Sequence, residues 1–204
     1  MSELLDRIGV LERKYKPKSV VKSDKKPHFL QLEVYDITLQ DGTKFSREKM
    51  LKNGKEGSSA FILPITKQGK IVLICEPRVF TKRQVGFAIP AGYVEENEKA
   101  EVGAKRELLE ETGYTCQSIK LINKFYQDMG CSSALNYLFI ATGCEKVTSQ
   151  HLDGDEHITY FEVTFDEGKQ LVDLGYICDP QSILAINGYE LMKLKSKYEE
   201  LEKW

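Results

Sequence analysis

Short apolar runs separated by glycine, proline and charged residues dominate the middle of the chain. From Ser58 onward they read SAFILPIT, KIVLICEP, GFAIPAG, IKLINKFYQD, ALNYLFIATG and HITYFEVTF. Runs of this length that are rich in β-branched and aromatic residues and end at turn-forming residues are typical of strands. The pattern therefore predicts a β-sheet in this part of the chain.

Two segments follow a helical period instead. Residues 99–112, between predicted strands, form a short amphipathic pattern. The last segment, DPQSILAINGYELMKLKSKYEELEKW, predicts a surface-packed helix that Gly188 could interrupt. Its apolar positions are Ile183, Ile186, Leu191, Leu194, Tyr198 and Leu201. Strands with an inserted helix predict an α+β or mixed α/β core in which helices pack on a sheet.

The first part of the chain, residues 1–57, holds a candidate hairpin. FLQLEVYDI and KFSREKML flank TLQDGT, in which Asp41 and Gly42 are a strong signal for a tight turn. A two-stranded hairpin is only marginally stable alone in water. We therefore expect this small antiparallel β-segment to pack against residues 58–204 or against a second copy of the protein.

Composition and charge narrow the class of protein. The 204 residues suffice for one domain with a sizeable core, and 41% hydrophobic with 29% charged residues is typical of a folded protein. A formal net charge of -2 argues against a surface that coats DNA or RNA, so any nucleotide ligand should be small. No apolar run approaches membrane-spanning length, which predicts a cytoplasmic protein. The five scattered cysteines should be reduced.

The segment GYVEENEKAEVGAKRELLEETGY, from Gly92 to Tyr114, carries the candidate chemistry. On a helix that advances ~100° per residue, Glu107, Glu110 and Glu111 fan out on the same side as the small residues. These small residues are Ala100, Gly103 and Ala104, and Val102 and Leu109 form a second apolar stripe roughly opposite. Clustered anions repel each other, whereas Mg²⁺ or Mn²⁺ prefers such hard oxygen ligands. The cluster is therefore better explained as a metal site than as a solvated helix face.

Neighbouring residues would complete this site. Gly113 is placed to end the helix in the left-handed conformation. Gly92 lies in a Pro-Ala-Gly turn that would bring the carbonyl of Ala91 or Gly92 against the carboxylates as a further oxygen ligand. Arg106 is most simply a structural clamp that pairs with Glu98, rather than a contact to substrate.

This segment closely resembles the Nudix box, G-x5-E-x7-R-E-U-x-E-E-x-G-U, in which U is a bulky apolar residue. Tyr114 stands at the final bulky site, and every fixed position is filled. The matching residues are Gly92, Glu98, Arg106, Glu107, Leu108, Glu110, Glu111 and Gly113. Such a match is far more specific than a lone glycine motif. The resemblance implies the Nudix fold, an α/β/α sandwich with a mixed β-sheet.

Nudix proteins typically hydrolyse a nucleoside diphosphate linked to another group, and the resemblance implies that reaction here. It implies Mg²⁺ or Mn²⁺ as the cofactor, because metal ions neutralise the charge of the diphosphate. Glu107 and Glu111 would be the principal ligands, Glu110 a further ligand or water-orienting group, and the Ala91 carbonyl a backbone ligand. In relatives that cleave ADP-ribose the general base often lies on a later loop, and DGDEHITYFEV places Glu156 there. An ordinary acidic surface loop is the alternative.

The resemblance to ADP-ribose and nucleoside-diphosphate-sugar hydrolases covers most of residues 57–189. IVLICEPRVF is similar to a strand that ends in Q-[YF]-R and points an arginine at the diphosphate, which nominates Arg78 as a substrate contact. The N-terminal β-segment is similar to an addition that reaches a partner subunit and helps to build the substrate pocket. The resemblance thus implies a homodimer, with a dimerisation and pocket segment over 1–57 and the Nudix domain over 58–204.

Several departures leave the substrate open. Met129 and Ala134 stand where relatives that cleave ADP-ribose commonly carry a proline and a glutamate, and Glu76-Pro77 replaces a glutamine and an aromatic residue. We expect ADP-ribose, cleaved to AMP and ribose 5-phosphate, with another nucleoside diphosphate sugar or a dinucleotide as the alternative. A non-catalytic nucleotide-sensing module is disfavoured because every carboxylate of the Nudix box is present. A protein that only mediates interactions is disfavoured because that role gives no reason for glutamates to cluster on one helix. The isolated residues His28, His151 and His157 are interpreted as surface or packing residues.

Overall fold

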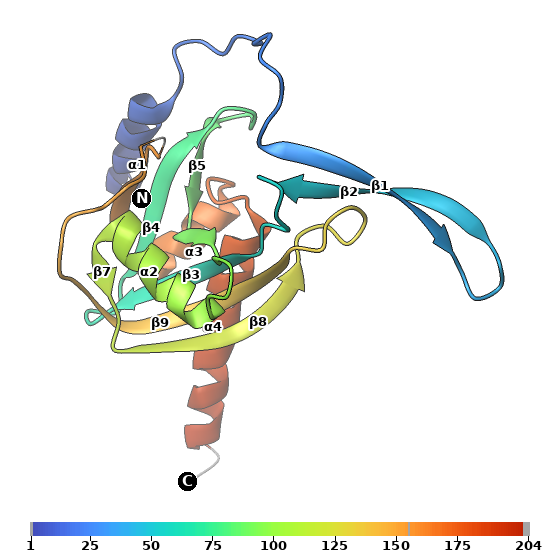
Figure 1. The fold of residues 1–204 in the computed structure, drawn as a ribbon. Helices are drawn as coiled ribbons and strands as arrows, with labels where there is room; N and C mark the ends of the chain where they lie inside the picture. The colour runs from blue at the N-terminus through green and yellow to red at the C-terminus, as the bar shows by residue number, and fades with distance from the viewer. Residues whose placement is uncertain (1, 155, 202–204) are drawn as a thin grey trace.

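The computed structural model describes residues 2–154 and 156–201, except for the side chains of Ser2 and of residues 197–201. The predicted apolar positions Tyr198 and Leu201 therefore lie outside the described side chains. Figure 1 shows a sheet with helices around it and a hairpin that reaches away from this body. The helices are α1 (Ser2–Tyr15), α2 (Ala100–Thr112), α3 (Phe165–Asp173) and α4 (Pro180–Leu201). The strands are β1 (Leu30–Thr38), β2 (Lys44–Lys52), β3 (Ser59–Thr66), β4 (Ile71–Arg78), β5 (Gln84–Ala88), β6 (Ala91–Tyr93), β7 (Tyr114–Thr115), β8 (Ser118–Tyr126), β9 (Leu135–Lys146) and β10 (Thr159–Val163).

The main sheet is mixed. Its strand order is β10-β4-β3-β9-β7, and β5 pairs with β4, β6 with β3 and β8 with β9. β3 and β9 run parallel, with Ile62 opposite Phe139, whereas β4 is antiparallel to both β10 and β5. The predicted mixed β-sheet with packed helices is confirmed.

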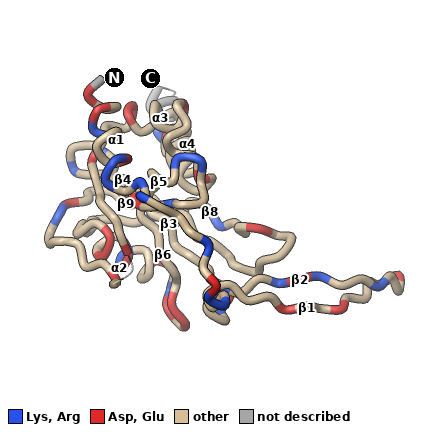
Figure 2. The backbone as a smooth tube through the Cα atoms, turned by 90° about the horizontal axis from the view of Figure 1, so that it is seen from above, with Lys and Arg blue, Asp and Glu red and all other residues tan. Residues whose placement is uncertain are grey.

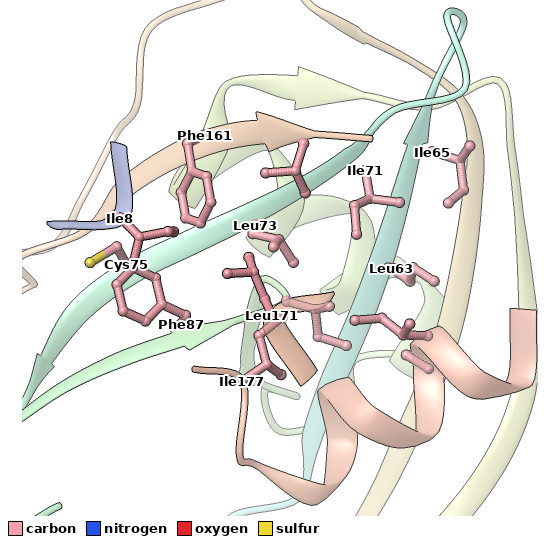
Figure 3. Packing of buried hydrophobic residues seen from close by; sticks show 14 of the residues in the cluster. Ile8, Leu63, Ile65, Ile71, Leu73, Cys75, Phe87, Phe161, Leu171 and Ile177 are labelled. Carbon is pink, nitrogen blue, oxygen red and sulfur yellow. The ribbon is translucent and has the colours of Figure 1, made fainter. Parts of the chain in front are cut away.

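Both faces of this sheet are covered by helices, because successive side chains of a strand point to opposite faces. In β3, Ile62 packs with Ala104 and Leu108 of α2, whereas Leu63 packs in a larger cluster with residues of α1, α3 and α4. Figure 3 shows this larger cluster, which contains Leu63 of β3 and Leu171 of α3. Burial on both faces explains why the strands read as nearly continuous apolar runs.

The N-terminal hairpin forms a separate sheet of β1 and β2. Its predicted turn is confirmed: Gly42 has a φ of 86°, and the N–H of Thr43 donates to Asp41 Oδ1 at 2.9 Å. Figure 2 shows the hairpin extending from the body with acidic residues along β1 and basic residues along β2. Leu32 and Val34 on β1 are 65% and 69% exposed. The hairpin thus presents apolar side chains to solvent.

Helices α3 and α4 differ from the sequence-based expectation. α3 was not predicted, although Thr164 and Glu167 form a capping box at its start, a signal that the sequence carries. α4 runs through Gly188 without the expected interruption. Glycine costs a helix about 1 kcal/mol relative to alanine, and burial of the preceding Ala185 and Ile186 against the sheet offsets that cost.

The cysteine thiols and the apolar content of the helices are two further features of the fold. All five cysteines are free, and burial raises the pKa of the Cys75 and Cys144 thiols to about 12, which keeps them unreactive. Among the described residues, no helix is both long and apolar enough to cross a membrane.

Helix α1 was also not predicted, and it belongs to the main core rather than to the hairpin. Leu4 and Ile8 are buried, and Leu11 and Tyr15 pack against the same cluster as Leu73. The apolar residues recur at helical spacing, so the signal was present in a segment that is otherwise highly charged. The residues before the hairpin therefore help to close one face of the sheet.

We expect Ile8→Ala to lower the free energy of unfolding by about 2–5 kcal/mol, the usual cost of truncating a fully buried isoleucine. Ile8 is 0% exposed, whereas Val10 on the same helix is 57% exposed. The matched variant Val10→Ala should therefore change stability by less than about 0.5 kcal/mol. Urea unfolding of both variants checks this, and equal small effects would mean that α1 is not docked on the sheet.

Candidate functional site

Helix α2 is bounded where the sequence predicts. Lys99 before it is extended, and Gly113 after it takes the left-handed conformation with a φ of 75° while its N–H donates to the Leu109 carbonyl at 2.8 Å. A Cβ at Gly113 would also lie less than 3.0 Å from the Thr148 carbonyl oxygen. Glycine is therefore required at this position for backbone conformation and for space.

Two of the clustered glutamates lie on the buried face of α2. Glu107 and Glu111 are 9% and 4% exposed and share this face with Ala104 and Leu108. Glu110 is half-buried, whereas the second apolar stripe, Val102 and Leu109, faces solvent. The carboxylates thus occupy the side of the helix that packs on the protein, which a solvated helix face would not do.

Strand β6 runs along these carboxylates. The N–H of Ala91 donates to Glu111 Oε2 at 2.9 Å. A Cβ at Gly92 would lie less than 3.0 Å from all three atoms of the Glu107 carboxyl group, closer than real Cβ atoms come. A side chain at position 92 would therefore have to displace the Glu107 carboxyl group from its observed position. The role of the Ala91 carbonyl as a metal ligand stays a prediction.

Arg106 links the start of the helix to the glutamates. Its Nε and Nη2 donate to the two carboxylate oxygens of Glu98, both at 3.1 Å, and Nη2 also donates to the Tyr93 carbonyl at 2.9 Å. Its Nη1 donates to Glu107 at 2.8 Å and to Glu110 at 2.9 Å. Arg106 and Glu98 therefore form the bidentate pair expected of a clamp.

Burial makes the charged forms of these glutamates unfavourable. The pKa of Glu111 lies well above its usual range because the carboxyl is desolvated, and the nearby carboxylates of Glu107, Glu76 and Glu156 raise it further. Burial also raises the pKa of Glu107, against the opposing effect of Arg106. The protein therefore holds anionic groups where their own environment disfavours the charge.

Arg78 and Glu156 belong to other elements of the fold. Arg78 ends β4, where its Nη2 lies 2.5 Å from Glu76 Oε1, and the Glu76 carboxyl has a pKa raised by burial. Glu156 lies in the loop between β9 and β10, where its carboxylate accepts from the N–H of Asp153 at 3.1 Å. Both residues line the same cavity as the glutamates of α2, although they come from segments distant in sequence.

One cavity of about 790 Å³ brings most of the predicted site residues together. The predicted residues that line it are Arg78, Ala91, Arg106, Glu107, Glu110, Glu111 and Glu156. Glu98 does not line the cavity but accepts hydrogen bonds from Arg106. It is also lined by residues that the sequence did not nominate: His28, Phe29, Asn53, Ser59, Phe61, Glu76, Tyr93, His151 and His157. All three histidines of the chain line this cavity, and no local motif connects them in the sequence.

The chemical type of the donor atoms in this cavity suits a divalent cation. Carboxylate oxygens on one helix face, with an excess of negative charge and a backbone strand close by, are the ligands that Mg²⁺ and Mn²⁺ use. In the described part of the chain, however, no three acidic, histidine or cysteine side chains already surround one point. The reason is local: Glu107 and Glu110 are turned toward Arg106, and Glu111 toward Ala91. Cation binding would need these carboxylates to turn from their present partners.

We expect Glu111→Gln to stabilise the metal-free protein at pH 7–8. A buried carboxyl whose pKa is raised on folding binds its proton more tightly when folded, so stability falls as the pH rises from the unfolded pKa through the folded pKa. Glutamine carries no charge to desolvate, and its amide oxygen can still accept from Ala91. Urea unfolding in a chelator should show a stability gain that disappears below about pH 4, where glutamate is protonated in both states. A variant less stable than wild type at every pH would contradict this account.

The chain matches the model of the NUDIX domain family over residues 55–178. It is 31% identical over 170 residues to a methanol dehydrogenase activator from Bacillus methanolicus, covering 82% of this chain and 89% of that protein. It is also 31% identical over 163 residues to an ADP-ribose pyrophosphatase from Bacillus subtilis (strain 168), covering 79% and 85% of the two chains. A GDP-mannose pyrophosphatase from Escherichia coli (strain K12) is 28% identical over 160 residues, covering 75% and 83%.

Solved structures give the same fold. The crystal structure of an ADP compounds hydrolase superposes with a TM-score of 0.70 at 18% sequence identity, covering 85% of this chain and 92% of that chain. The domain match spans most of the strands described above, and it includes α2 with the complete Nudix box. The chain therefore belongs to the Nudix hydrolase family.

Proposed function

We propose that this protein is a metal-dependent pyrophosphohydrolase that cleaves the diphosphate of a nucleoside diphosphate linked to another group. The observation that carries the proposal is the placement of Glu107, Glu110 and Glu111 on the cavity side of one helix, with the backbone of Gly92 directly against the Glu107 carboxyl group. A polyanionic substrate and an anionic protein surface can meet only if cations lie between them. A diphosphate held by divalent ions satisfies that condition.

Glu107, Glu110, Glu111 and the Ala91 carbonyl would hold Mg²⁺ or Mn²⁺, the kind of ion that the Nudix family typically uses. Such an ion supplies neutralisation of the charge that develops on the diphosphate oxygens. Glu98 keeps Arg106 in place through both of its carboxylate oxygens while Glu107 and Glu110 leave their present bonds to that guanidinium. Arg106 would then be a structural clamp rather than a substrate contact.

Glu156 and Arg78 would act on the substrate itself. Glu156 lines the same cavity as the glutamates of α2, and its side chain is half-buried, which suits a base that accepts a proton from the attacking water. Arg78 would bind the diphosphate, and since it is paired with Glu76, the substrate would have to compete with that carboxylate. This competition favours ligands with a high negative charge, such as a diphosphate, over neutral ones.

ADP-ribose, cleaved to AMP and ribose 5-phosphate, is the first candidate substrate. The relative named ADP-ribose pyrophosphatase supports it, but the relatives named GDP-mannose pyrophosphatase keep other nucleoside diphosphate sugars and dinucleotides as the second candidate. The sequence also departs from relatives that cleave ADP-ribose at two positions outside the cavity lining. Ala134 is fully buried and offers no carboxylate, and Met129 is exposed. A non-catalytic, nucleotide-sensing role is disfavoured because the box keeps all its carboxylates.

The N-terminal segment, residues 1–57, would contribute to the pocket and to a homodimer. His28, Phe29 and Asn53 line the cavity from this segment. Leu32 and Val34 lie on one face of the hairpin beside Met50, and both are largely exposed. A second copy that covers this face would remove the apolar surface from water.

Hydrolysis should depend entirely on a divalent cation. We expect turnover of ADP-ribose, a sugar nucleotide or a dinucleotide in Mg²⁺ or Mn²⁺ and none in a chelator, with Glu111→Gln lowering kcat by about a thousandfold or more. Chromatography of the products from a panel of these substrates measures the activity and identifies the bond that breaks. Cleavage in a chelator, or full activity of Glu111→Gln, would overturn the proposed metal site.

The close approach at Gly92 gives a second test. We expect Gly92→Ala to lower kcat/KM by about a hundredfold, because the added methyl group must push the Glu107 carboxyl from its place and misplacement by ~1 Å costs about this much. Gly9→Ala is the matched control: its new methyl group would meet only the end of the flexible Arg13 side chain at 3.4 Å. Steady-state kinetics should find the control unchanged, and an active Gly92→Ala would mean that Glu107 need not occupy the observed position.

A further inference from the structure

The loop that carries Glu156 is attached to the C-terminal end of α2. This loop, residues 147–158, joins β9 to β10. The N–H groups of Val147 and Thr148 donate to the Gly113 carbonyl at 2.9 and 3.3 Å, and the N–H of His151 donates to the Glu110 carbonyl at 2.9 Å. The last carbonyls of a helix have no partner within the helix. These bonds therefore satisfy the helix end and fix the start of the loop against it.

Gln150 extends this attachment to the far end of the loop. Its Nε2 donates to the main-chain carbonyl of Glu111 at 2.6 Å and to the main-chain carbonyl of Ile158 at 3.3 Å. Glu111 belongs to α2, and Ile158 is a buried residue directly before β10. A primary amide has two N–H donors, so one side chain can serve both carbonyls. Gln150 therefore ties the helix to both ends of the loop.

The other hydrogen bonds at this junction do not connect α2 to the end of the loop. The donors of Val147, Thr148 and His151 are main-chain groups, which are present whatever the side chain is. Lys146 Nζ donates to the Thr112 carbonyl at 3.3 Å and has no hydrogen bond to the described residues of the loop, 147–154 and 156–158. Among the described residues, Gln150 is the one side chain that hydrogen-bonds both α2 and the end of the loop. The geometry of the junction thus depends on the side chain at this position.

The position of Glu156 depends on how the loop is docked. Its carboxylate accepts from the Asp153 N–H at 3.1 Å, and its N–H donates to the Asp153 carbonyl at 3.0 Å, so both bonds lie within the loop. Nothing in these two bonds fixes Glu156 relative to Glu107 and Glu111. The bridge made by Gln150 supplies that fixed relation, because it joins the Glu111 main chain to the residue that ends the loop.

We propose that Gln150 is a positioning residue for hydrolysis, which holds the loop of Glu156 at a set distance from the glutamates of α2. It contacts two carbonyl oxygens and acts on the reaction only through Glu156. The proposal rests on the proposed function, since it takes Glu156 to act on the substrate.

The test uses two substitutions at Gln150 and one control in the full-length protein. Gln150→Met keeps the length of the side chain and removes both donors, so we expect kcat to fall about 10- to 100-fold with KM nearly unchanged. Gln150→Lys restores an N–H donor and should recover most of kcat. Lys146→Met removes the neighbouring bond to the helix end but not the bridge, so it should lower stability and leave kcat unchanged.

Two further measurements separate positioning from a merely structural role. In a Glu156→Gln background, Gln150→Met should have no further effect on kcat, because the residue that it positions is already lost. In the metal-free protein, amide hydrogen exchange in residues 147–158 should speed up in Gln150→Met and stay slow in Gln150→Lys.

The failures of the two proposals differ. If Glu156→Gln is impaired but Gln150→Met lowers kcat by the same factor in both backgrounds, or if exchange in the loop does not change, the positioning role is wrong and the proposed function stands. If Glu156→Gln keeps full activity, the role proposed for Glu156 fails, and the positioning role fails with it.

Discussion

The crowding of carboxylates on the inner face of α2 is the constraint on which the rest of the site depends. Glu107 and Glu111 are buried, and their pKa values are raised by that burial. A folded chain rarely places anions where both solvation and neighbouring charge oppose them unless a further charge compensates. In the metal-free protein Arg106 compensates in part through its bonds to Glu107 and Glu110. The same geometry suits divalent ions, which would replace these bonds.

The fold is arranged to keep this helix in one place. The sheet packs against one side of α2 through Ala104 and Leu108. Strand β6 places the backbone of Gly92 directly against the Glu107 carboxyl group. The C-terminal end of the helix is satisfied by residues of the loop that carries Glu156. The hydrogen bonds that end the helix thus also set the geometry of the site. The unfavourable burial of carboxylates at this site is offset by favourable packing elsewhere in the domain.

The features that the sequence predicted correctly are those fixed by residues close together in the chain. The bounds of α2, the turn at Gly42 and the pairing of Arg106 with Glu98 depend on residues close in sequence, and the sequence predicted all three. Helices α1 and α3 also had local signals, the apolar spacing of a highly charged segment for α1 and a capping box for α3, but neither helix was predicted. The continuity of α4 through Gly188 follows from burial, which overrides local propensity.

Long-range geometry accounts for what the sequence did not predict. His28 and His151 come from segments far apart in sequence and line the same cavity only because of the fold, so no spacing rule could have connected them. The bridge made by Gln150 likewise depends on how the loop meets the end of α2. Glutamine outside a motif carries no chemical signature, which is why its role emerges only from the contacts.

The most direct test of the central claim is the binding of Mn²⁺ to the protein itself, followed by electron paramagnetic resonance. Titration of the wild-type protein with a non-hydrolysable nucleoside diphosphate analogue present should show bound Mn²⁺ at stoichiometric occupancy. The double variant Glu107→Gln/Glu111→Gln should leave the ion free under the same conditions. Equal occupancy in both proteins would contradict the account, as would free Mn²⁺ beside wild-type protein that has bound the analogue.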